Sequence, residues 1–317
     1  MLGGTATSEG GLTLSQDGSH LVAAGYDQIP GKSSSIDQGG AATVALIDGD
    51  GNVDTSTTLP GFPAGNNVRS AASDTGTNIW VSGATNGVAY ATDGSSTSTA
   101  LSSSKNIMQL EVFNNQLYYS SQKSSGPQGV GAVGTGLPSS GSPTFSLLPG
   151  SPESSGTPYA FALVALGAGS TPNTLYVTDG TSTAPSILKF GLSGGAWVAE
   201  GSISVAVPSG DTLTGLAASV SGSTATLFAT AGGGGASGGG ALFEATDSTG
   251  AGGSASGSVT TPIASAATDE AFRGVALVPT PNVGNGLPEA PAAVIFPVGA
   301  GLIGAAVIGL KRRRRVA

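Results

Sequence analysis

Four oxygen-bearing side chains alternate with glycine or valine in one short stretch of the chain, at Asp48, Asp50, Asn52 and Asp54. Calcium takes about six to eight oxygen ligands from a tightly curved backbone, and alternate positions of a loop can supply them. The stretch lacks the bidentate glutamate that completes an EF-hand loop, because Leu59 holds that position. Two interpretations stay open: a candidate calcium site, or a hairpin turn in which Asp and Gly serve the turn geometry alone.

Cations are scarce before the C-terminus, which makes Arg69 and Arg273 candidates for ligand binding. Each precedes an apolar alternating run, and Glu9, Asp211 and Glu270 stand near equivalent positions before other runs. If those runs are equivalent strands, we expect the five side chains to ring one mouth of a central channel, where rigid scaffolds often bind ligands. The alternative is that the arginines bridge neighbouring repeats by pairing with nearby carboxylates.

The sequence offers few groups for nucleophilic or acid–base catalysis. It contains one histidine, His20, and no cysteine. Any Ser-His-Asp triad or histidine-ligated metal must therefore use His20, and thiolate chemistry is excluded. His20 follows an Asp17-Gly18 turn at the start of a predicted strand, where a polar side chain is ordinarily solvated. We expect no catalytic site at His20 and no cofactor beyond the candidate calcium ion.

The charge is distributed unevenly along the chain. Five of the 11 basic residues lie at positions 311–315, so the first 310 residues carry 6 basic against 19 acidic residues, a net charge of −13. A body this acidic repels phosphate backbones, which excludes nucleic acid as a partner.

The elements that must position these side chains are predicted to be short strands. Glycine numbers 53 of 317 residues and charged residues make up 9%, which argues against a helical bundle and against ordinary disorder. A polar residue followed by an apolar pair recurs in HLVAAG, NIWVSG, QLYYSS, TLYVTD and TLFATA, which begin at His20, Asn78, Gln116, Thr174 and Thr226. Alternating apolar runs precede and follow these copies. Four strands in about 40 to 60 residues form the blade of a β-propeller.

A sixth copy of the first strand is predicted at residues 272–281, but no further strands of that repeat follow. Propellers close their ring by completing one blade from both chain ends. We therefore predict a six-bladed ring over residues 1–281 whose N-terminal strands and export signal lie upstream of Met1. The alternative is a closed five-bladed ring with residues 272–281 as a spare edge strand. Within the fifth repeat, residues 256–263 are the predicted fourth strand.

One turn in the first repeat is similar to a known propeller family. Residues 15–24, SQDGSHLVAA, resemble the Ser-x-Asp-Gly-x-x-Leu turn and strand of YVTN-type bacterial propellers. In that setting Asp17-Gly18 closes a hairpin, and the strand that follows packs between blades. The resemblance implies a propeller fold and implies no activity.

The C-terminal region has the pattern of a membrane anchor. Residues 290–310 are uncharged and largely apolar, and five consecutive cations follow at 311–315. About 20 apolar residues cross a bilayer as a helix, and the positive-inside rule places the basic tail, 311–317, in the cytoplasm and residues 1–289 outside. The sequence predicts a single-pass transmembrane helix that anchors an extracellular domain.

A short motif connects the linker, residues 282–289, to this span. It reads LPEAP and consists of Leu287, Pro288, Glu289, Ala290 and Pro291. The motif, apolar helix and arginine cluster together resemble the C-terminal sorting signals of bacterial surface proteins, of which the PEP-CTERM and LPXTG classes are the nearest. Ala290 replaces the second proline of Pro-Glu-Pro, and no Thr-Gly follows Glu289. The resemblance implies anchoring and leaves cleavage of the tail open.

Two classes of function remain. The favoured one is a non-enzymatic bacterial surface protein, an acidic propeller that serves as an envelope or interaction module for a surface protein or a glycan. The alternative is a propeller enzyme of the lactonase, quinoprotein or glycosidase kind, with a metal or carboxylate site at the channel mouth. The scarcity of histidine, cysteine and charged side chains favours the first class.

Overall fold

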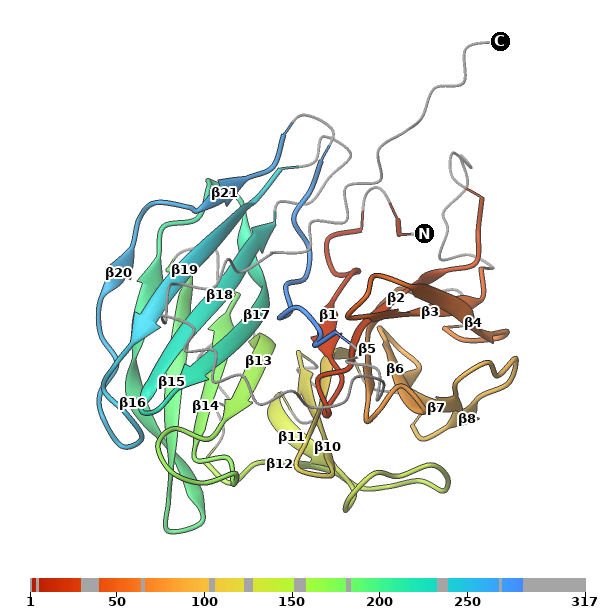
Figure 1. The fold of residues 1–317 in the computed structure, drawn as a ribbon, viewed down its shortest axis with the longest axis horizontal. Coiled ribbons are helices and arrows are strands. Elements are labelled where there is room, and N and C mark those ends of the chain that lie inside the picture. The colour runs from red at the N-terminus through yellow and green to blue at the C-terminus, as the bar shows by residue number, and fades with distance from the viewer. Residues whose placement is uncertain are drawn as a thin grey trace, which may run out of the picture.

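The computed structural model describes residues 2–3, 6–29, 40–63, 66–102, 106–122, 128–150, 158–180, 184–232, 239–267 and 270–281. The regular elements assigned in these ranges are all β-strands. They form five sheets, and Figure 1 shows the sheets fanned around a common centre. The prediction of an all-β propeller with five complete repeats is confirmed. The predicted six-bladed ring is wrong, because the described strands form five blades and residues 272–281 add no sixth sheet.

The first three blades contain four strands each, in sequence order, with the first strand innermost. Blade 1 consists of β1 (Leu12–Leu14), β2 (His20–Tyr26), β3 (Ala42–Asp48) and β4 (Val53–Leu59). Blade 2 consists of β5 (Val68–Ser73), β6 (Asn78–Gly83), β7 (Gly87–Thr92) and β8 (Thr99–Ala100). Blade 3 consists of β9 (Ile107–Phe113), β10 (Gln116–Ser121), β11 (Gly129–Val133) and β12 (Phe145–Leu147).

Blades 4 and 5 differ from the prediction at their outer edges. Blade 4 contains β13 (Pro158–Val164), β14 (Thr174–Asp179), β15 (Ser186–Ser193) and β16 (Ala196–Val205), with a fifth, two-residue strand, β20 (Ser258–Val259), at its outer edge. Blade 5 consists of β17 (Thr212–Ser221), β18 (Thr224–Gly232), β19 (Ala241–Asp247) and β21 (Ala264–Ser265). The predicted fourth strand at 256–263 is wrong, because β20 pairs in parallel with β16 of blade 4 and β21 completes blade 5.

The repeated sequence segment forms the second strand of each blade, and its fifth residue has a structural role in blades 2 to 4. The first strand of these blades shifts register against the second. A hydroxyl from the second strand accepts the N–H of the first strand at this shift. The bonds are Ser70 N to Ser82 Oγ at 3.1 Å, Gln109 N to Ser120 Oγ at 3.1 Å and Ala160 N to Thr178 Oγ1 at 2.9 Å. The repeat thus supplies the polar partner that a buried β-bulge needs.

The core consists of apolar layers between neighbouring blades. The layer between blades 2 and 3 contains Trp80, Leu110 and Leu117, and the layer between blades 4 and 5 contains Tyr176 and Phe243. Both faces of a blade are covered, so β14 is buried at every position. Burying one large apolar side chain stabilises the fold by about 1.5–3 kcal/mol. The inner strands are therefore mostly buried, whereas the outer strands carry the exposed positions, as in β4, β8 and β16.

Residues 272–281 do not form the predicted strand. The segment passes between blade 5 and blade 1, and its backbone groups bond singly to both neighbours. Thr214 and Thr230 of blade 5 donate to the Arg273 carbonyl, and Gly274 N donates to the Gly10 carbonyl. Isolated bonds to two different blades cannot make a ladder, so no sixth sheet is formed among the described residues. We call residues 272–281, which lie between blades 5 and 1, the wedge.

The predicted C-terminal anchor lies outside the described residues. This applies to the linker 282–289, the motif at 287–291, the span 290–310 and the tail 311–317. Within the ranges that the structure does describe, no helix has the length and apolar character needed to cross a membrane.

Candidate functional site

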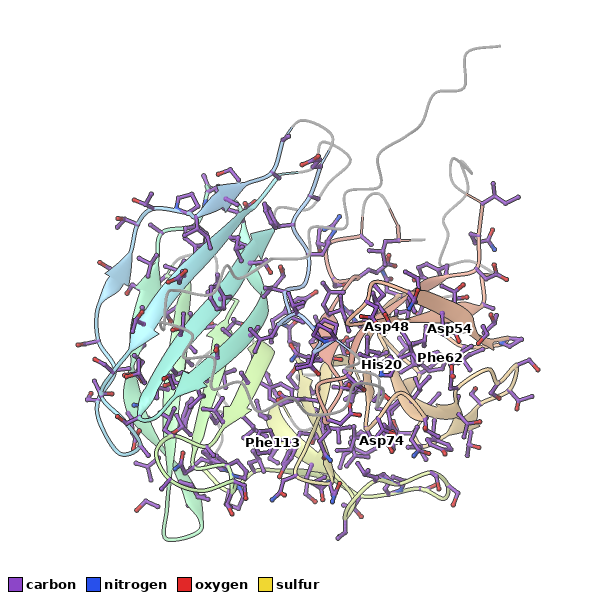
Figure 2. All side chains as sticks on the ribbon, in the orientation of Figure 1. His20, Asp48, Asp54, Phe62, Asp74 and Phe113 are labelled. Carbon is purple, nitrogen blue, oxygen red and sulfur yellow. The ribbon has the colours of Figure 1, made fainter. Side chains whose placement is uncertain are left out.

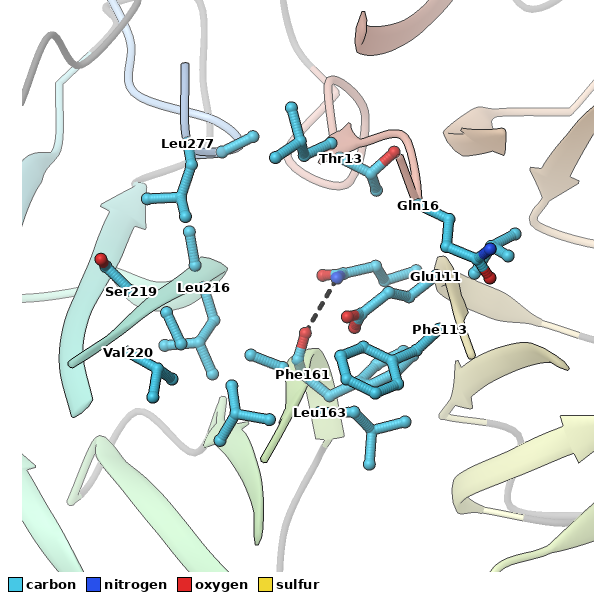
Figure 3. Close-up of a pocket in the computed structure, with 18 of the residues that line it drawn as sticks. Thr13, Gln16, Glu111, Phe113, Phe161, Leu163, Leu216, Ser219, Val220 and Leu277 are labelled. Atoms are coloured by element: carbon cyan, nitrogen blue, oxygen red, sulfur yellow. Dashed lines mark hydrogen bonds between the residues drawn. The ribbon is translucent and has the colours of Figure 1, made fainter. Parts of the chain in front are cut away.

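The inner strands of the propeller enclose a cavity of about 560 Å³, the central pocket. Its walls come from β1, β9, β13, β17 and residues 275–277 of the wedge. Figure 3 shows Thr13, Glu111, Phe113, Leu216 and Leu277 facing this space from different sides. The pocket lies where the first strands of blades 1, 3, 4 and 5 face one another across the axis and their side chains leave the space between them unfilled.

The lining of the central pocket is mostly apolar and neutral. Leucine, valine, alanine and phenylalanine side chains dominate it, with Thr13, Gln16, Gln109 and Ser219 as neutral polar groups. Among the described residues that line the pocket, Glu111 is the only ionisable one. A single carboxyl group in such surroundings can donate or accept a hydrogen bond, but acid–base catalysis by paired carboxylates needs a second acid.

Glu111 is held in the neutral form by its surroundings. It lies on β9 and its carboxyl group points into the pocket (Figure 3). Burial raises the pKa of Glu111 to about 8, although the Leu163 backbone N–H favours the ionised form. Its Oε2 atom is shielded from solvent and has no hydrogen-bond partner among the described residues. At neutral pH Glu111 is therefore mainly a carboxylic acid with a free hydrogen-bonding group.

Amide side chains fix the walls around Glu111. Gln109 donates to the Phe161 carbonyl at 3.0 Å, which joins blades 3 and 4. At the end of the inner strands, Gln16 of blade 1 and Asn115 after β9 make two bonds, Gln16 Nε2 to Asn115 Oδ1 at 2.8 Å and Asn115 N to Gln16 Oε1 at 2.6 Å. Asn115 reaches this position because it adopts a left-handed turn conformation, with φ of 57°.

At the opposite end of the inner strands lies a second polar group, the mouth cluster, formed by Glu9, Arg69, Tyr159 and Arg273. Arg69 of blade 2 hydrogen-bonds the Tyr159 hydroxyl of blade 4, and Arg273 of the wedge lies close enough to interact with it electrostatically. Burial raises the pKa of Tyr159 to about 12, although both arginines act in the opposite direction. Side chains from non-adjacent blades meet here, so the cluster lies over the axis of the ring.

The structure places the five predicted mouth residues in two groups. Glu9, Arg69 and Arg273 belong to the mouth cluster. Asp211 is buried before β17, where burial raises its pKa, and Glu270 is exposed and accepts Ala267 N at 3.3 Å. No described contact joins Asp211 or Glu270 to the arginines. Tyr159, which joins the two arginines, was not predicted.

Glu9 is buried but does not form an ion pair with either arginine among the described contacts. Its Oε1 accepts Tyr26 Oη at 2.6 Å and Asn67 Nδ2 at 3.0 Å, and its Oε2 accepts Gly3 N at 2.6 Å. The ion pairs that the described residues make both belong to Lys189. The alternative in which the arginines bridge blades through carboxylates has the electrostatic interaction of Glu9 with Arg69 in its favour, but no ion pair among the described contacts.

The candidate calcium stretch forms the turn between β3 and β4. Asp48 Oδ1 accepts Asp50 N at 3.0 Å and Asn52 N at 2.9 Å, and its Oδ2 accepts Asn52 Nδ2 at 2.8 Å. These bonds lower the pKa of Asp48, with the Asn52 side chain as the largest cause. Asp54 accepts Ser56 N at 2.7 Å. In the described ranges no three His, Cys, Asp or Glu side chains gather in a way that could hold a metal ion.

Calcium is expected to leave the melting temperature of the full chain unchanged. The oxygens of Asp48 already accept backbone and amide hydrogens, so a cation would have to break the turn that presents it. The measurement is a thermal melt after chelation, with millimolar calcium and with magnesium as the control. A calcium-specific rise that Asp50→Asn and Asp54→Asn both abolish would establish the site instead, because a ligand of the native state raises stability by linkage.

His20 lies outside the central pocket. Its Nδ1 is 2.7 Å from Ser19 Oγ, and its ring packs against Gly76 of blade 2. Figure 2 shows His20, Asp48 and Asp54 on the first blades, away from Phe113 of the central pocket. The expectation that His20 is not a catalytic residue remains a prediction, and its position gives it no access to Glu111.

Sequence reasoning missed one further charged group, which joins blades 4 and 5. Lys189 of β15 is fully buried, and its Nζ lies 2.9 Å from Asp247 Oδ2 at the end of β19. Nζ also donates to Thr249 Oγ1 at 2.8 Å and to the carbonyls of Gly250 and Gly253 at 2.6 and 2.7 Å. This network holds the loop after β19 against blade 4, which explains why β20 joins that blade.

The missed residues carried local signals. Glu111 and Lys189 are single charges inside otherwise apolar runs, MQLEVF and SILKFG. A charge in a buried strand is rare unless it is paired or functional. Glu111 and Lys189 could therefore have been chosen from the sequence as candidate functional residues. The residues that they contact in the fold could not.

Comparisons with known proteins show only distant similarity of shape. No family model matches the chain and no curated protein matches it in sequence. Among solved structures, a prolyl endopeptidase chain aligns with a TM-score of 0.40 and 13% identity, over 75% of this chain and 35% of that one. A chain from a complex of S. cerevisiae Dbp5, Nup159 and Gle1 gives 0.41 and 10%, over 86% and 84%. Porphyromonas gingivalis dipeptidyl peptidase 4 gives 0.34 and 10%, over 74% and 35%.

The chain spans about a third of the length of the two peptidase chains that it resembles. At identities of 13% and below, the resemblance concerns the backbone alone, and no activity is transferred from those enzymes. The fold follows from the strand order of this chain itself.

Proposed function

We propose that this protein is a non-enzymatic surface protein whose propeller binds an uncharged part of a partner in the central pocket. The supporting observation is the lining of the pocket, in which Glu111 is the single ionisable residue and mainly protonated at neutral pH. An apolar cavity with a few polar groups suits a neutral ligand with one hydrogen-bond acceptor. A neutral sugar or an uncharged peptide segment has this chemistry.

The anchoring part of the proposal rests on the sequence. The apolar span 290–310 and the five cations after it favour a membrane anchor with the propeller outside, and the LPEAP motif favours a sorting tail. A position of the propeller outside the cell agrees with the net negative charge of residues 1–310, because net charge of one sign keeps a protein soluble and prevents self-association.

The enzymatic alternative is not favoured by the same observation. A lactonase, quinoprotein or glycosidase would need a metal, a cofactor or a pair of acids facing its substrate. The pocket lining offers one carboxyl group and neutral amides and hydroxyls.

The proposal is tested on intact cells that carry the full chain with a tag at its C-terminus. We expect an array of neutral glycans and peptides to identify a ligand that binds the cells, and external protease to remove that binding while sparing the tag. Leu277→Trp, which fills the pocket, is expected to abolish binding, whereas Thr99→Trp on the exposed outer strand β8 leaves it intact.

Three outcomes would contradict the proposal. One is recovery of the whole protein in the cytosol, and another is ligand binding that Leu277→Trp does not change. The third is turnover of a lactone or glycoside that Glu111→Gln abolishes, which would establish the enzymatic alternative.

A further inference from the structure

The mouth cluster brings two arginines together, and its one acidic group, Glu9, interacts electrostatically with Arg69 without forming an ion pair among the described contacts. Arg69 comes from β5 of blade 2 and Arg273 from the wedge between blades 5 and 1, and Tyr159 of β13 interacts with both. Neither arginine forms an ion pair within the described part of the chain. Two like charges over one axis repel each other, and a carboxylate beyond ion-pair distance offsets only part of this repulsion.

Each arginine also has a donor that lacks an acceptor. Arg69 Nε and Arg273 Nη1 are shielded from solvent and have no hydrogen-bond partner among the described residues. A buried N–H without an acceptor destabilises a fold, and a guanidinium group binds oxygen anions through two parallel N–H bonds. The only carboxylate in the cluster, that of Glu9, is already occupied by Tyr26, Asn67 and Gly3.

We propose that the mouth cluster binds one oxyanion group, a carboxylate, phosphate or sulfate on a small ligand, between Arg69 and Arg273. The bound oxygens would accept Arg69 Nε–H and Arg273 Nη1–H, while Tyr159 stays hydrogen-bonded to Arg69 and positions it. The two arginines are thus binding residues of a site that faces the ring axis, and the unpaired donors are the groups that the ligand satisfies.

The charge of the rest of the molecule limits the size of this ligand. The first 310 residues carry a net charge of −13, so an extended polyanion is repelled over most of the surface. A small ligand with one anionic group avoids this repulsion, because its charge can be confined to the axis.

The oxyanion site is separate from the central pocket. On the inner strand β13, Tyr159 precedes the first pocket residue, Phe161, by two positions, and Arg273 precedes Val275 by the same distance. Glu111 is not part of the mouth cluster, so failure of one site does not imply failure of the other. The proposal therefore stands on its own observations and does not depend on the proposed function.

The test uses the full chain in detergent at constant ionic strength, titrated separately with sodium phosphate, sulfate and acetate against sodium chloride. We expect at least one oxyanion to bind by calorimetry and to raise the melting temperature above the chloride control. Arg69→Gln and Arg273→Gln are each expected to weaken that binding about tenfold or more, because each removes a charged hydrogen bond. The anion that binds most tightly identifies the ligand chemistry.

Matched variants separate binding from general charge and folding effects. Thr99→Glu, on the exposed outermost strand of the same blade as Arg69, lowers the net charge by the same amount and is expected to leave binding unchanged. Glu111→Gln is also expected to have no effect. If a glutamine variant does not fold, Arg69→Lys and Arg273→Lys retain the charge, and loss of affinity at an unchanged melting temperature supports the site. The proposal is overturned if none of the three anions binds more tightly than chloride. It is also overturned if both arginine variants bind the anion as tightly as the wild type does.

Discussion

Replacing Lys189 with methionine is expected to lower the free energy of unfolding by about 3–5 kcal/mol, because removal of one partner leaves the other charge buried and unpaired. Lys189 is fully buried, and Asp247, its partner at 2.9 Å, is 3% exposed. Methionine fills the space of the lysine stem but leaves Asp247 and the carbonyls of Gly250 and Gly253 without their donor. The measurement is equilibrium denaturation of the full chain at neutral pH.

Two variants serve as controls for this prediction. Glu200→Gln removes the more distant carboxylate, 3.8 Å from Lys189 Nζ, and is expected to cost less than about 1 kcal/mol. The double variant Lys189→Met with Asp247→Asn should lose less free energy of unfolding than the two single variants together, because neither buried charge remains. Additive losses would show that the two residues do not act as a pair.

The same pair gives the protein a defined sensitivity to acid. Burial alone would raise the pKa of Asp247, but bonds from Thr249, Tyr176 and Lys189 outweigh it and hold the pKa at about 2. A carboxylate with a lowered pKa stabilises the fold above its unfolded value, near 3.8, and this contribution is lost as pH falls toward 2. We expect the loss of stability between pH 4 and 2 to be smaller in the Lys189→Met variant.

Replacing Glu111 with glutamine is expected to stabilise the protein increasingly as pH rises. The folded pKa of Glu111 is about 8 against an ordinary value of 4.5. Below pH 4.5 the Glu111 carboxyl group is protonated in both the folded and the unfolded state, so the effect of the substitution on the free energy of unfolding should not change with pH there. Between pH 4.5 and 8 the unfolded carboxyl group loses its proton while the folded one retains it, so the wild-type fold becomes less stable. Above pH 8 the difference should level off, at on the order of 4–5 kcal/mol.

Denaturation curves at pH 5, 7 and 9 measure this difference. Glu244→Gln is the matched control, because it makes the same chemical change at an exposed position on β19. A Glu111→Gln variant whose advantage over the wild type is the same at pH 5 and pH 9 would show that Glu111 ionises normally in the folded protein.

The pattern of strands could be predicted from the sequence because its signals are local. Alternation of apolar residues, Asp-Gly and Asn-Gly turns and the five repeated segments each depend on residues within a few positions of one another. The second strands β6, β10, β14 and β18 begin within two residues of the repeats predicted at Asn78, Gln116, Thr174 and Thr226. The five repeats gave the five complete blades, but the sixth blade predicted from residues 272–281 was wrong.

The tertiary structure alone decided which of these residues meet. Arg69, Tyr159 and Arg273 come from parts of the ring that are far apart in sequence, and they converge because side chains of non-adjacent blades can touch only over the axis. The depth of Glu111 in the pocket depends on four other elements that surround it. The segment at 272–281 was predicted from its apolar alternation, but a strand also needs a neighbour with free backbone groups, and the wedge finds only single bonds on either side. Alternation identifies a segment able to form a strand, whereas ring closure determines whether a partner for it exists.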